Sequence, residues 1–189
     1  MGLIFSKALQ EDLYRYEGEK CNNLFIRLRY LFCVPGFTYV FFFRHASQSR
    51  NIFTQTFWSI CLHVTKLITH IQIPARTSIG RGFRIVHFGH IVVNPEAIIG
   101  KNFNISQGCL IGNAQGKREG APVIGDNVCI NANAIIIGNA RIGNNVLIAP
   151  GAFVNFDVPD NSIVIGNPGK VIQRDSSPTE KYIVYPLND

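Results

Sequence analysis

The stretch VIGDNVCINANAIIIGNARIGNNVLI, residues 123–148, decides the fold. Its isoleucines recur at every sixth position, as Ile124, Ile130, Ile136, Ile142 and Ile148. An α-helix repeats near 3.6 residues and a strand near 2, so neither element by itself gives a strict period of six. Six residues are enough for one short strand and one turn. The repeat therefore indicates short strands wound into stacked coils.

The same period continues on both sides of this stretch. Aliphatic residues occupy the equivalent places at Ile73, Ile79, Ile85, Ile91, Ile99, Ile105, Ile111 and Val154. Three strands and three turns close one triangular coil, in which each aliphatic side chain points inward onto its equivalent in the next coil. We therefore predict a mainly β fold, a parallel β-helix of hexapeptide repeats.

The period is broken twice. Two extra residues fall between Ile91 and Ile99, which we place near Asn94-Pro95. Seven extra residues fall between Ile111 and Ile124, and this polar, glycine-rich segment, residues 113–121, is predicted to project as a loop.

The chain outside the repeats has a different character. Residues 1–70 hold most of the aromatic residues and several helix-compatible segments, which predicts a small N-terminal α-helical region. Residues 71–174 form the β-helix, and residues 175–189 form a polar C-terminal tail. The segment from Phe53 to His70 falls short of a continuous apolar span, and its spacing suits an amphipathic helix. Packing on the protein and contact with a membrane surface through residues 1–70 both stay open.

Composition narrows the partners. The formal net charge of +6 favours an acidic partner such as a nucleic acid, an anionic membrane or a phosphate-bearing cofactor. The repeat region lacks closely spaced Lys and Arg with stacking aromatic residues, so we expect no nucleic acid. Five cysteines without metal-ligand spacing, and a start without a secretory signal pattern, predict a cytoplasmic protein, with the inner face of the membrane as a second site of residence.

Three segments carry a family resemblance. The segment VHFGHIVVNP (86–95), the segment PVIGDNV (122–128) and the run from Asp157 to Ile172 resemble the hexapeptide-repeat acetyltransferases, and the N-terminal region resembles a shortened serine acetyltransferase. The resemblance implies a left-handed coil, a homotrimer with active sites between subunits, acetyl-CoA as the co-substrate in the groove between two β-helices, and direct acetyl transfer to a hydroxyl. The nearest members look like enzymes that decorate surface polysaccharides.

His87 matches the catalytic histidine of that family. A hydroxyl is a poor nucleophile until its proton is removed, and an imidazole titrates near neutrality, so a histidine suits the role of general base. Two interpretations of His90 stay open. It assists His87 or contacts the acceptor, or it is an ordinary residue of the turn without a role in the reaction. A backbone carbonyl or Glu96 is the candidate that orients His87. Because only two histidines lie in the repeats, we expect no metal site.

The resemblance also suggests positions for the cofactor. Small or polar residues on the edges of the later coils would leave room for the pantetheine arm, and they are Ala132, Ala149, Pro150 and Asn155. Lys170 and Arg174 would meet the phosphates of CoA, the first as a point charge and the second as a fork. Lys117 and Arg118 in the projecting loop would cover the cofactor or an anionic acceptor.

Three positions depart from the serine acetyltransferase pattern. Gln72 replaces the aspartate that orients the base, Val86 replaces the acidic residue that helps hold the ammonium of serine, and Ala121 replaces a second histidine. These losses favour a carbohydrate hydroxyl of a capsular or other surface polysaccharide as the acceptor. The alternatives are serine O-acetylation for cysteine synthesis and, from another class, a non-catalytic β-helix scaffold.

Overall fold

The N-terminal part of the chain is helical. The structure, a computed structural model, describes residues 5–188. Its helices are α1 (Lys7–Glu17), the 3-10 helix η1 (Gly18–Asn22), α2 (Leu24–Cys33), α3 (Pro35–Gln48) and α4 (Ile52–Thr69). Pro35 occupies the first position of α3, and Val34 alone separates α3 from α2. Proline is tolerated at a helix start because the first N–H groups have no partner within the helix.

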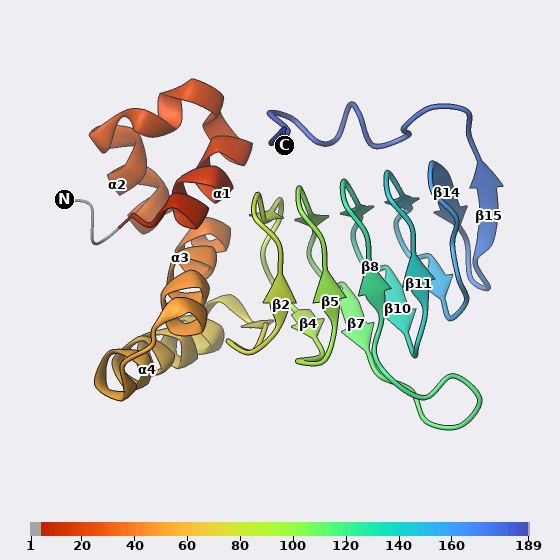
Figure 1. Ribbon diagram of the computed structural model, residues 1–189, viewed down its shortest axis with the longest axis horizontal. Coiled ribbons are helices and arrows are strands. Elements are labelled where there is room, and N and C mark those ends of the chain that lie inside the picture. The colour runs from red at the N-terminus through yellow and green to blue at the C-terminus, as the bar shows by residue number, and fades with distance from the viewer. Residues whose placement is uncertain (1–4, 189) are drawn as a thin grey trace.

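The rest of the chain is a three-sided parallel β-helix (Figure 1). Face 1 contains β1 (Ile71–Gln72), β4 (Ile91–Val93), β7 (Leu110–Gly112), β10 (Ile135–Ile137) and β13 (Phe153–Val154). Face 2 contains β2 (Ser78–Ile79), β5 (Ile98–Ile99), β8 (Val123–Ile124) and β11 (Arg141–Ile142). Face 3 contains β3 (Arg84–Ile85), β6 (Asn104–Ile105), β9 (Cys129–Ile130), β12 (Leu147–Ile148), β14 (Ser162–Ile165) and β15 (Lys170–Gln173). All strands pair in parallel except β15, which turns back on β14 and closes the array.

The repeat fills the interior as predicted. Ile105, Ile130 and Ile148 on face 3 are fully buried, and they stack in register along successive coils. The backbone N–H and C=O groups of each coil pair with those of the coils on either side. The inward side chains of all the coils together form one continuous hydrophobic core.

One of the two expected breaks lies elsewhere. Val93, not Ile91, is the register partner of Ile111, so Asn94-Pro95 adds no residue. The two extra residues lie between Ile85 and Val92, in the turn from β3 to β4. The period could not distinguish the two placements because Ile91 and Val93 are both aliphatic and both buried. The second break is where the sequence predicts it, in the loop between β7 and β8 that projects from the coil (Figure 1).

Asparagines line the corner between faces 2 and 3. Asn102, Asn127, Asn145 and Asn161 all have φ between +54° and +57°, a left-handed conformation that asparagine tolerates better than most residues. Their side chains form a ladder, in which Asn102 Nδ2 donates to Asn127 Oδ1 at 2.9 Å and Asn127 Nδ2 donates to Asn145 Oδ1 at 3.0 Å. The ladder holds the turns of successive coils in register.

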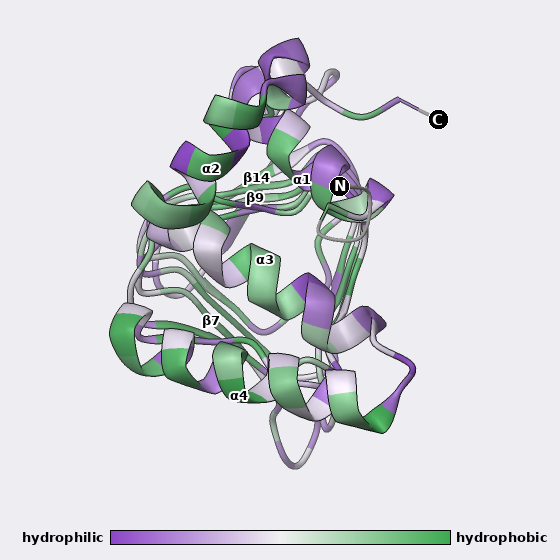
Figure 2. Ribbon diagram, turned by 90° about the vertical axis from the view of Figure 1, so that its left-hand side faces the viewer, coloured by the Kyte–Doolittle hydropathy of each residue, from purple (hydrophilic) through white to green (hydrophobic). Residues whose placement is uncertain are grey.

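Buried arginines fix the helices to the first coil. Arg44 on α3 binds both carboxylate oxygens of Asp12 on α1, at 2.6 and 3.0 Å, and donates to the carbonyls of Ile79 and Gly80. Arg15 on α1 donates to Gly82 O at 2.7 Å, and burial lowers its pKa to about 10. Viewed from the N-terminal end of the β-helix, the helices lie over the opening of the first coil (Figure 2).

The C-terminal tail lies back along the outside of the β-helix, as Figure 1 shows. Thr179 Oγ1 donates to Asn127 O at 2.9 Å, and Asn104 Nδ2 donates to Tyr182 O at the same distance. Further along, Arg15 Nε donates to Val184 O at 3.0 Å. The tail thus joins the late coils to the first helix and covers part of face 3.

Candidate active site

His87 lies in the turn from β3 to β4, at the corner where face 3 passes to face 1 (corner 3–1). Its side chain is exposed, and among residues 5–188 it has no hydrogen bond, ion pair or ring contact. This turn is two residues longer than its equivalents, because Ile85 pairs with Ile105 while Val92 pairs with Leu110. The extra length displaces the histidine turn from the regular course of the corner, where a substrate can reach it.

His90 ends the same turn in a left-handed conformation, with φ of 53°. Its ring stacks on that of His70, with centroids 5.2 Å apart and planes within 3°. His70 is the C-terminal cap of α4 and also has a positive φ. The contact therefore connects the end of α4 to the histidine turn. Within the described part of the chain, no three His, Cys, Asp or Glu side chains come together as metal ligands would.

Small residues continue corner 3–1 beyond the histidine turn. The turn after β9 contains Ala132, and the turn after β12 contains Ala149, Pro150 and Gly151. Backbone hydrogen bonds stack these turns: Gly108 N donates to Gly89 O, Asn133 N to Gln107 O and Gly151 N to Ala132 O, at 2.9 to 3.0 Å. A Cβ built on Gly89 or Gly151 would meet nothing within 4 Å, so this edge is open. An extended, flexible ligand has room along it.

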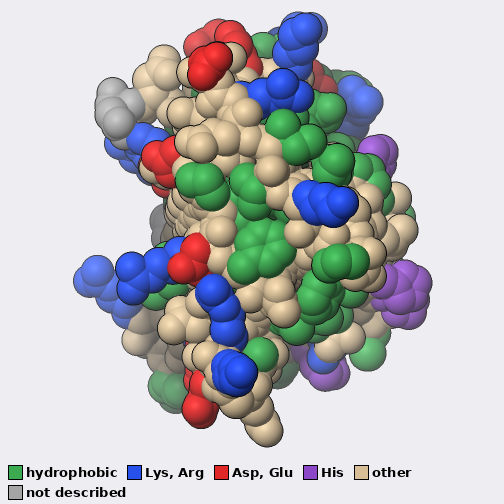
Figure 3. All heavy atoms as spheres, turned by 90° about the vertical axis from the view of Figure 1, so that its right-hand side faces the viewer, with side chains coloured by type: hydrophobic (Ala, Val, Ile, Leu, Met, Phe, Trp, Pro, Cys, Tyr) green, Lys and Arg blue, Asp and Glu red, His purple; other side chains and the backbone are tan. Residues whose placement is uncertain are grey.

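Lys170 begins β15 directly after the turn that ends this edge. β3, which precedes His87, and β15, which begins with Lys170, are five strand spacings apart along face 3, or about 24 Å. Arg174 follows the other end of β15, where its N–H donates to Asn161 O at corner 2–3. Lys170 thus shares an edge with His87, and Arg174 does not. Figure 3 shows this end of the molecule, with Lys and Arg side chains dispersed around exposed apolar ones.

Glu96 and Asn155 lie at a different corner. Glu96 is in the turn from β4 to β5, and Asn155 follows β13, so both are at corner 1–2. The side chain of Glu96 is exposed, and the strand β4 separates its turn from that of His87. Within one chain the structure does not bring either residue to the histidine.

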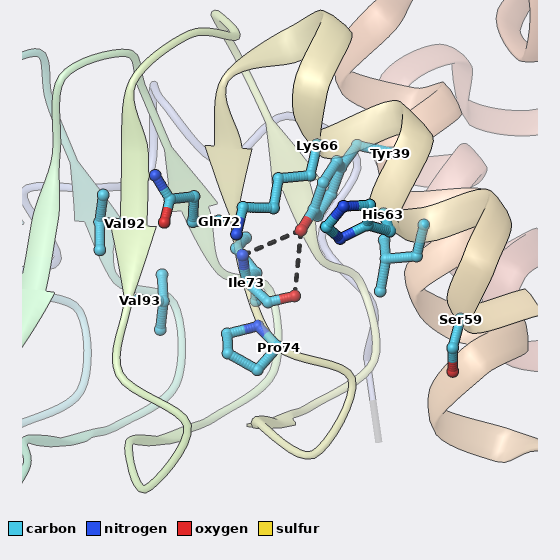
Figure 4. Close-up of a pocket in the computed structure, with 10 residues that line it drawn as sticks. Tyr39, Ser59, His63, Lys66, Gln72, Ile73, Pro74, Val92 and Val93 are labelled. Carbon is cyan, nitrogen blue, oxygen red and sulfur yellow. Dashed lines mark hydrogen bonds between the residues drawn. The ribbon is translucent and has the colours of Figure 1, made fainter. Parts of the chain in front are cut away.

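Gln72 lines a cavity of about 280 Å³ between α4 and face 1 (Figure 4). The lining residues are Tyr39, Ser59, Leu62, His63, Lys66, Gln72, Ile73, Pro74, Val92 and Val93. Tyr39 Oη accepts from Ile73 N at 2.9 Å and donates to Ile73 O at 3.0 Å, and its pKa is raised to about 12 by burial. Because Gln72 lies two residues after His70, this cavity borders the contact that holds the histidine turn.

The projecting loop is clamped to corner 1–2. Arg118 Nη1 lies 2.8 Å from Asp157 Oδ1, and Asp157 Oδ1 also accepts from Arg141 N at 3.0 Å. The bond from the Arg141 N–H and then that from Arg118 hold the pKa of Asp157 below its usual value. Lys117 is exposed beside this clamp. The loop therefore leans toward the later coils, away from corner 3–1.

Two features of the site escaped the sequence interpretation, the His70–His90 contact and the longer histidine turn. Both follow from the register of β1 on β4, in which Ile71 pairs with Ile91 and residue 70 comes to lie over residue 90. A repeat traced from Ile71 with a coil length of twenty residues contains that signal.

Comparison with known proteins gives a consistent result. The family of bacterial transferase hexapeptide repeats matches residues 121–155. A serine acetyltransferase of Synechococcus elongatus is 34% identical over 149 residues, which are 78% of this chain and 61% of the relative. One from Staphylococcus xylosus is 40% identical over 115 residues, 59% of this chain and 52% of the relative. The chain thus spans only half to three-fifths of the length of these relatives.

The fold gives the same answer. The crystal structure of Neisseria gonorrhoeae serine acetyltransferase in complex with serine superposes with a TM-score of 0.70 at 28% identity, and the match covers 88% of this chain and 68% of that one. The predicted left-handed β-helix with an N-terminal helical region is confirmed.

The predicted acceptor is wrong. A sugar hydroxyl of a surface polysaccharide was inferred from three side chains, Gln72, Val86 and Ala121, whereas the similarity to serine acetyltransferases extends over most of the chain. Replacement of individual groups around a site is weaker evidence than the identity of the proteins that share the whole framework. The chain is similar to the bacterial transferase hexapeptide-repeat family over residues 121–155, and it resembles serine acetyltransferases over 78% of its length.

Proposed function

We propose that this protein transfers the acetyl group of acetyl-CoA to the hydroxyl of L-serine. The observation that carries the proposal is the similarity to serine acetyltransferases over 78% of the chain, including the histidine turn. That turn protrudes at the head of an open edge bordered by small residues, an arrangement suited to an extended acyl donor.

His87 is the general base in this proposal. Its exposed imidazole accepts the proton of the serine hydroxyl while the oxygen attacks the carbonyl carbon of the thioester. The tetrahedral intermediate collapses, the carbon–sulfur bond breaks, and the imidazolium returns the proton to the sulfur of CoA. No acyl-enzyme forms, and the imidazole ends in its starting state.

Corner 3–1 binds the cofactor. The residues present fit an extended pantetheine arm, because Ala132 and Ala149 are small and Gly151 leaves open space above it. Lys170, about 24 Å from the histidine turn by strand spacing, meets a phosphate as a point charge. Asn155 and Arg174 belong to the other two corners, so a role for them in CoA binding requires a neighbouring subunit.

The assembly is a homotrimer. In a site shared between subunits, corner 1–2 of one subunit would face corner 3–1 of its neighbour. Glu96 or Asn155 of one subunit would then lie near His87 of the other. Face 2 presents Ile98 and Val123, which are 52% and 41% exposed, as apolar surface for such contacts. The division into residues 1–70, 71–174 and 175–189 remains our proposal for the domains, and the cytoplasm remains our proposal for its location.

Release of free thiol from acetyl-CoA tests this function. We expect release with L-serine, and a product whose mass is that of serine plus one acetyl group. D-serine serves as the matched control, because it has the same groups with the opposite configuration at Cα, and we expect it to give little thiol release. If the protein binds CoA by calorimetry but releases no thiol with L-serine, another acceptor is used. If it does not bind CoA at all, the non-catalytic scaffold is the correct interpretation.

A further inference from the structure

Helix α4 carries two apolar faces, and only one of them is covered. Leu62, Thr65 and Thr69 are buried against the rest of the protein. On the opposite side, large apolar residues recur at helical spacing and are 50–82% exposed: Phe53, Phe57, Ile60, Val64, Leu67 and Ile68. They occupy roughly 100° of the helix circumference, the width of an amphipathic stripe that normally packs on a partner. We call these six residues the α4 stripe.

A shorter set of the same kind lies on α2. Phe25, Leu28 and Phe32 follow one another at three- and four-residue spacing and are 45–76% exposed. Figure 2 shows α2 and α4 at the same end of the molecule, with α3 between them. That end therefore has two helices with outward apolar faces.

The segment of the chain that contains α2 and α4 has charges of one sign. No Asp or Glu occurs from Lys20 to Pro95, a stretch that contains nine basic residues: Lys20, Arg27, Arg29, Arg44, Arg50, Lys66, Arg76, Arg81 and Arg84. Arg44 is buried on Asp12, but Arg29, just after Leu28 on α2, and Arg50, just before the start of α4, are exposed. Glu17, which accepts from Tyr30 Oη at 2.8 Å, and the exposed Glu19 lie beside α2, but neither α2 nor α4 carries a carboxylate of its own. Apolar stripes with basic flanks on such helices match an interface helix that binds anionic lipid.

We infer that this end of the protein docks on an anionic membrane surface, with α4 lying in the plane of the headgroups and its stripe in the acyl boundary. The inference is independent of the acetyl transfer and goes beyond it. A second copy of the chain would fit the α4 stripe poorly, because two copies of this helix bring basic residues against basic residues, and α4 carries no carboxylate to pair with them.

The helices suit a position on the surface of a bilayer. An 18-residue helix such as α4 is about 27 Å long, and its buried side packs on face 1 and α3. No described helix is long and apolar enough to cross a bilayer by itself. The pair α2 and α3, with a bend of 99° between the two helices, is long and apolar enough when the two are taken together.

Vesicle flotation of the full chain tests the inference. The vesicles are phosphatidylcholine alone, or phosphatidylcholine with one-third phosphatidylglycerol, each at low and at high salt. The stripe variant combines Phe53→Gln, Ile60→Gln and Leu67→Gln, which removes exposed apolar surface with a residue of good helix propensity. Two controls are matched to it: Thr56→Gln on the exposed polar side of α4, and Ile172→Gln, an exposed apolar position at the far end of the coil.

We expect the full chain to float with the anionic vesicles, to lose most of that binding in high salt, and to bind phosphatidylcholine at least about tenfold more weakly. The stripe variant is expected to bind at least about tenfold more weakly with an unchanged circular dichroism spectrum, while both controls bind as the wild type does. Equal flotation of wild type and stripe variant overturns the inference. So does an absence of flotation together with a stripe-dependent change in sedimentation velocity, which assigns the surface to a second copy.

Discussion

The rings of His70 and His90 stack with their centroids 5.2 Å apart and their planes within 3° of parallel. One histidine ends α4 and the other ends the turn that contains His87. This turn is two residues longer than its equivalents, and it still bonds to the next coil, since Val86 N donates to Ile105 O and Gly108 N donates to Gly89 O. The stacked ring is a further contact, which ties the end of the turn to α4.

Removal of the His70 ring is expected to loosen the histidine turn. We predict that His70→Ala lowers kcat about three- to tenfold with a smaller change in KM, the effect of one lost aromatic contact. His70→Phe keeps a ring and is expected to retain most of the activity. Alanine and phenylalanine must both adopt the left-handed conformation of residue 70, so the difference between the two variants reports the effect of the ring. Steady-state kinetics with equal loss in both variants would contradict a role for the stacking.

The asparagine ladder gives a prediction for stability. Asn127→Ala removes two side-chain hydrogen bonds and puts alanine at φ of 57°. We expect it to lower the free energy of unfolding by about 2–3 kcal/mol. Asn127→Gly loses the same bonds but accepts the positive φ, and it is expected to cost about 1 kcal/mol less. Urea unfolding at a fixed protein concentration measures both, and equal costs would show that the backbone conformation is not strained.

Stability is expected to fall in alkaline solution. Burial raises the pKa of Tyr39 to about 12, and that of Cys109 and of Cys129 to about 11. An unfolded chain loses these protons at lower pH than the folded one, so the stabilisation is complete below the unfolded values and disappears as pH rises through the folded values. Tyr39 alone accounts for about 2–3 kcal/mol between pH 10 and pH 12. A free energy of unfolding that stays constant from pH 8 to pH 11 would contradict this.

The loop clamp predicts a change in proteolysis. Asp157 has a lowered pKa, so its carboxylate holds Arg118 at neutral pH and releases it only as pH falls through that lowered value. Asp157→Asn keeps an acceptor for the Arg141 N–H but removes the charge. We expect a several-fold faster tryptic cut after Lys117 with an unchanged melting temperature. Asp160→Asn is the control, because Asp160 lies at corner 2–3, where it accepts from Asn144 N, and does not contact the loop. Equal rates of cutting in the two variants would refute the clamp.

Much of the fold could be predicted because the period of six depends only on which residues are buried. Ile124, Ile130 and Ile136 are 2% exposed or less, as an inward position requires. The register across one turn could not be obtained in this way, since Ile91 and Val93 satisfy the period equally well. Strand pairing decides between them, and pairing depends on hydrogen bonds between coils rather than on composition.

The family resemblance suggested Ala132, Ala149 and Pro150 for the cofactor, and these residues lie at the same corner as His87. Their role there stays a prediction. Glu96 lies in the turn before Ile99 under either register, so it belongs to another corner than His87. Arg174 follows β15, which turns back antiparallel on β14, so the period does not place it. The acceptor was inferred from missing charged groups at Gln72 and Val86, and such absences do not identify what binds instead.

The central claim is that His87 is the base of an acetyl transfer to serine, and one measurement tests it most directly. The turnover of wild type and His87→Ala is compared in the thiol-release assay with saturating L-serine, alongside the affinity of each for CoA by calorimetry. The account predicts a fall in kcat of about 10²–10⁴-fold with an unchanged CoA affinity, because the group removed moves a proton and does not bind the cofactor. Full activity in His87→Ala would contradict it.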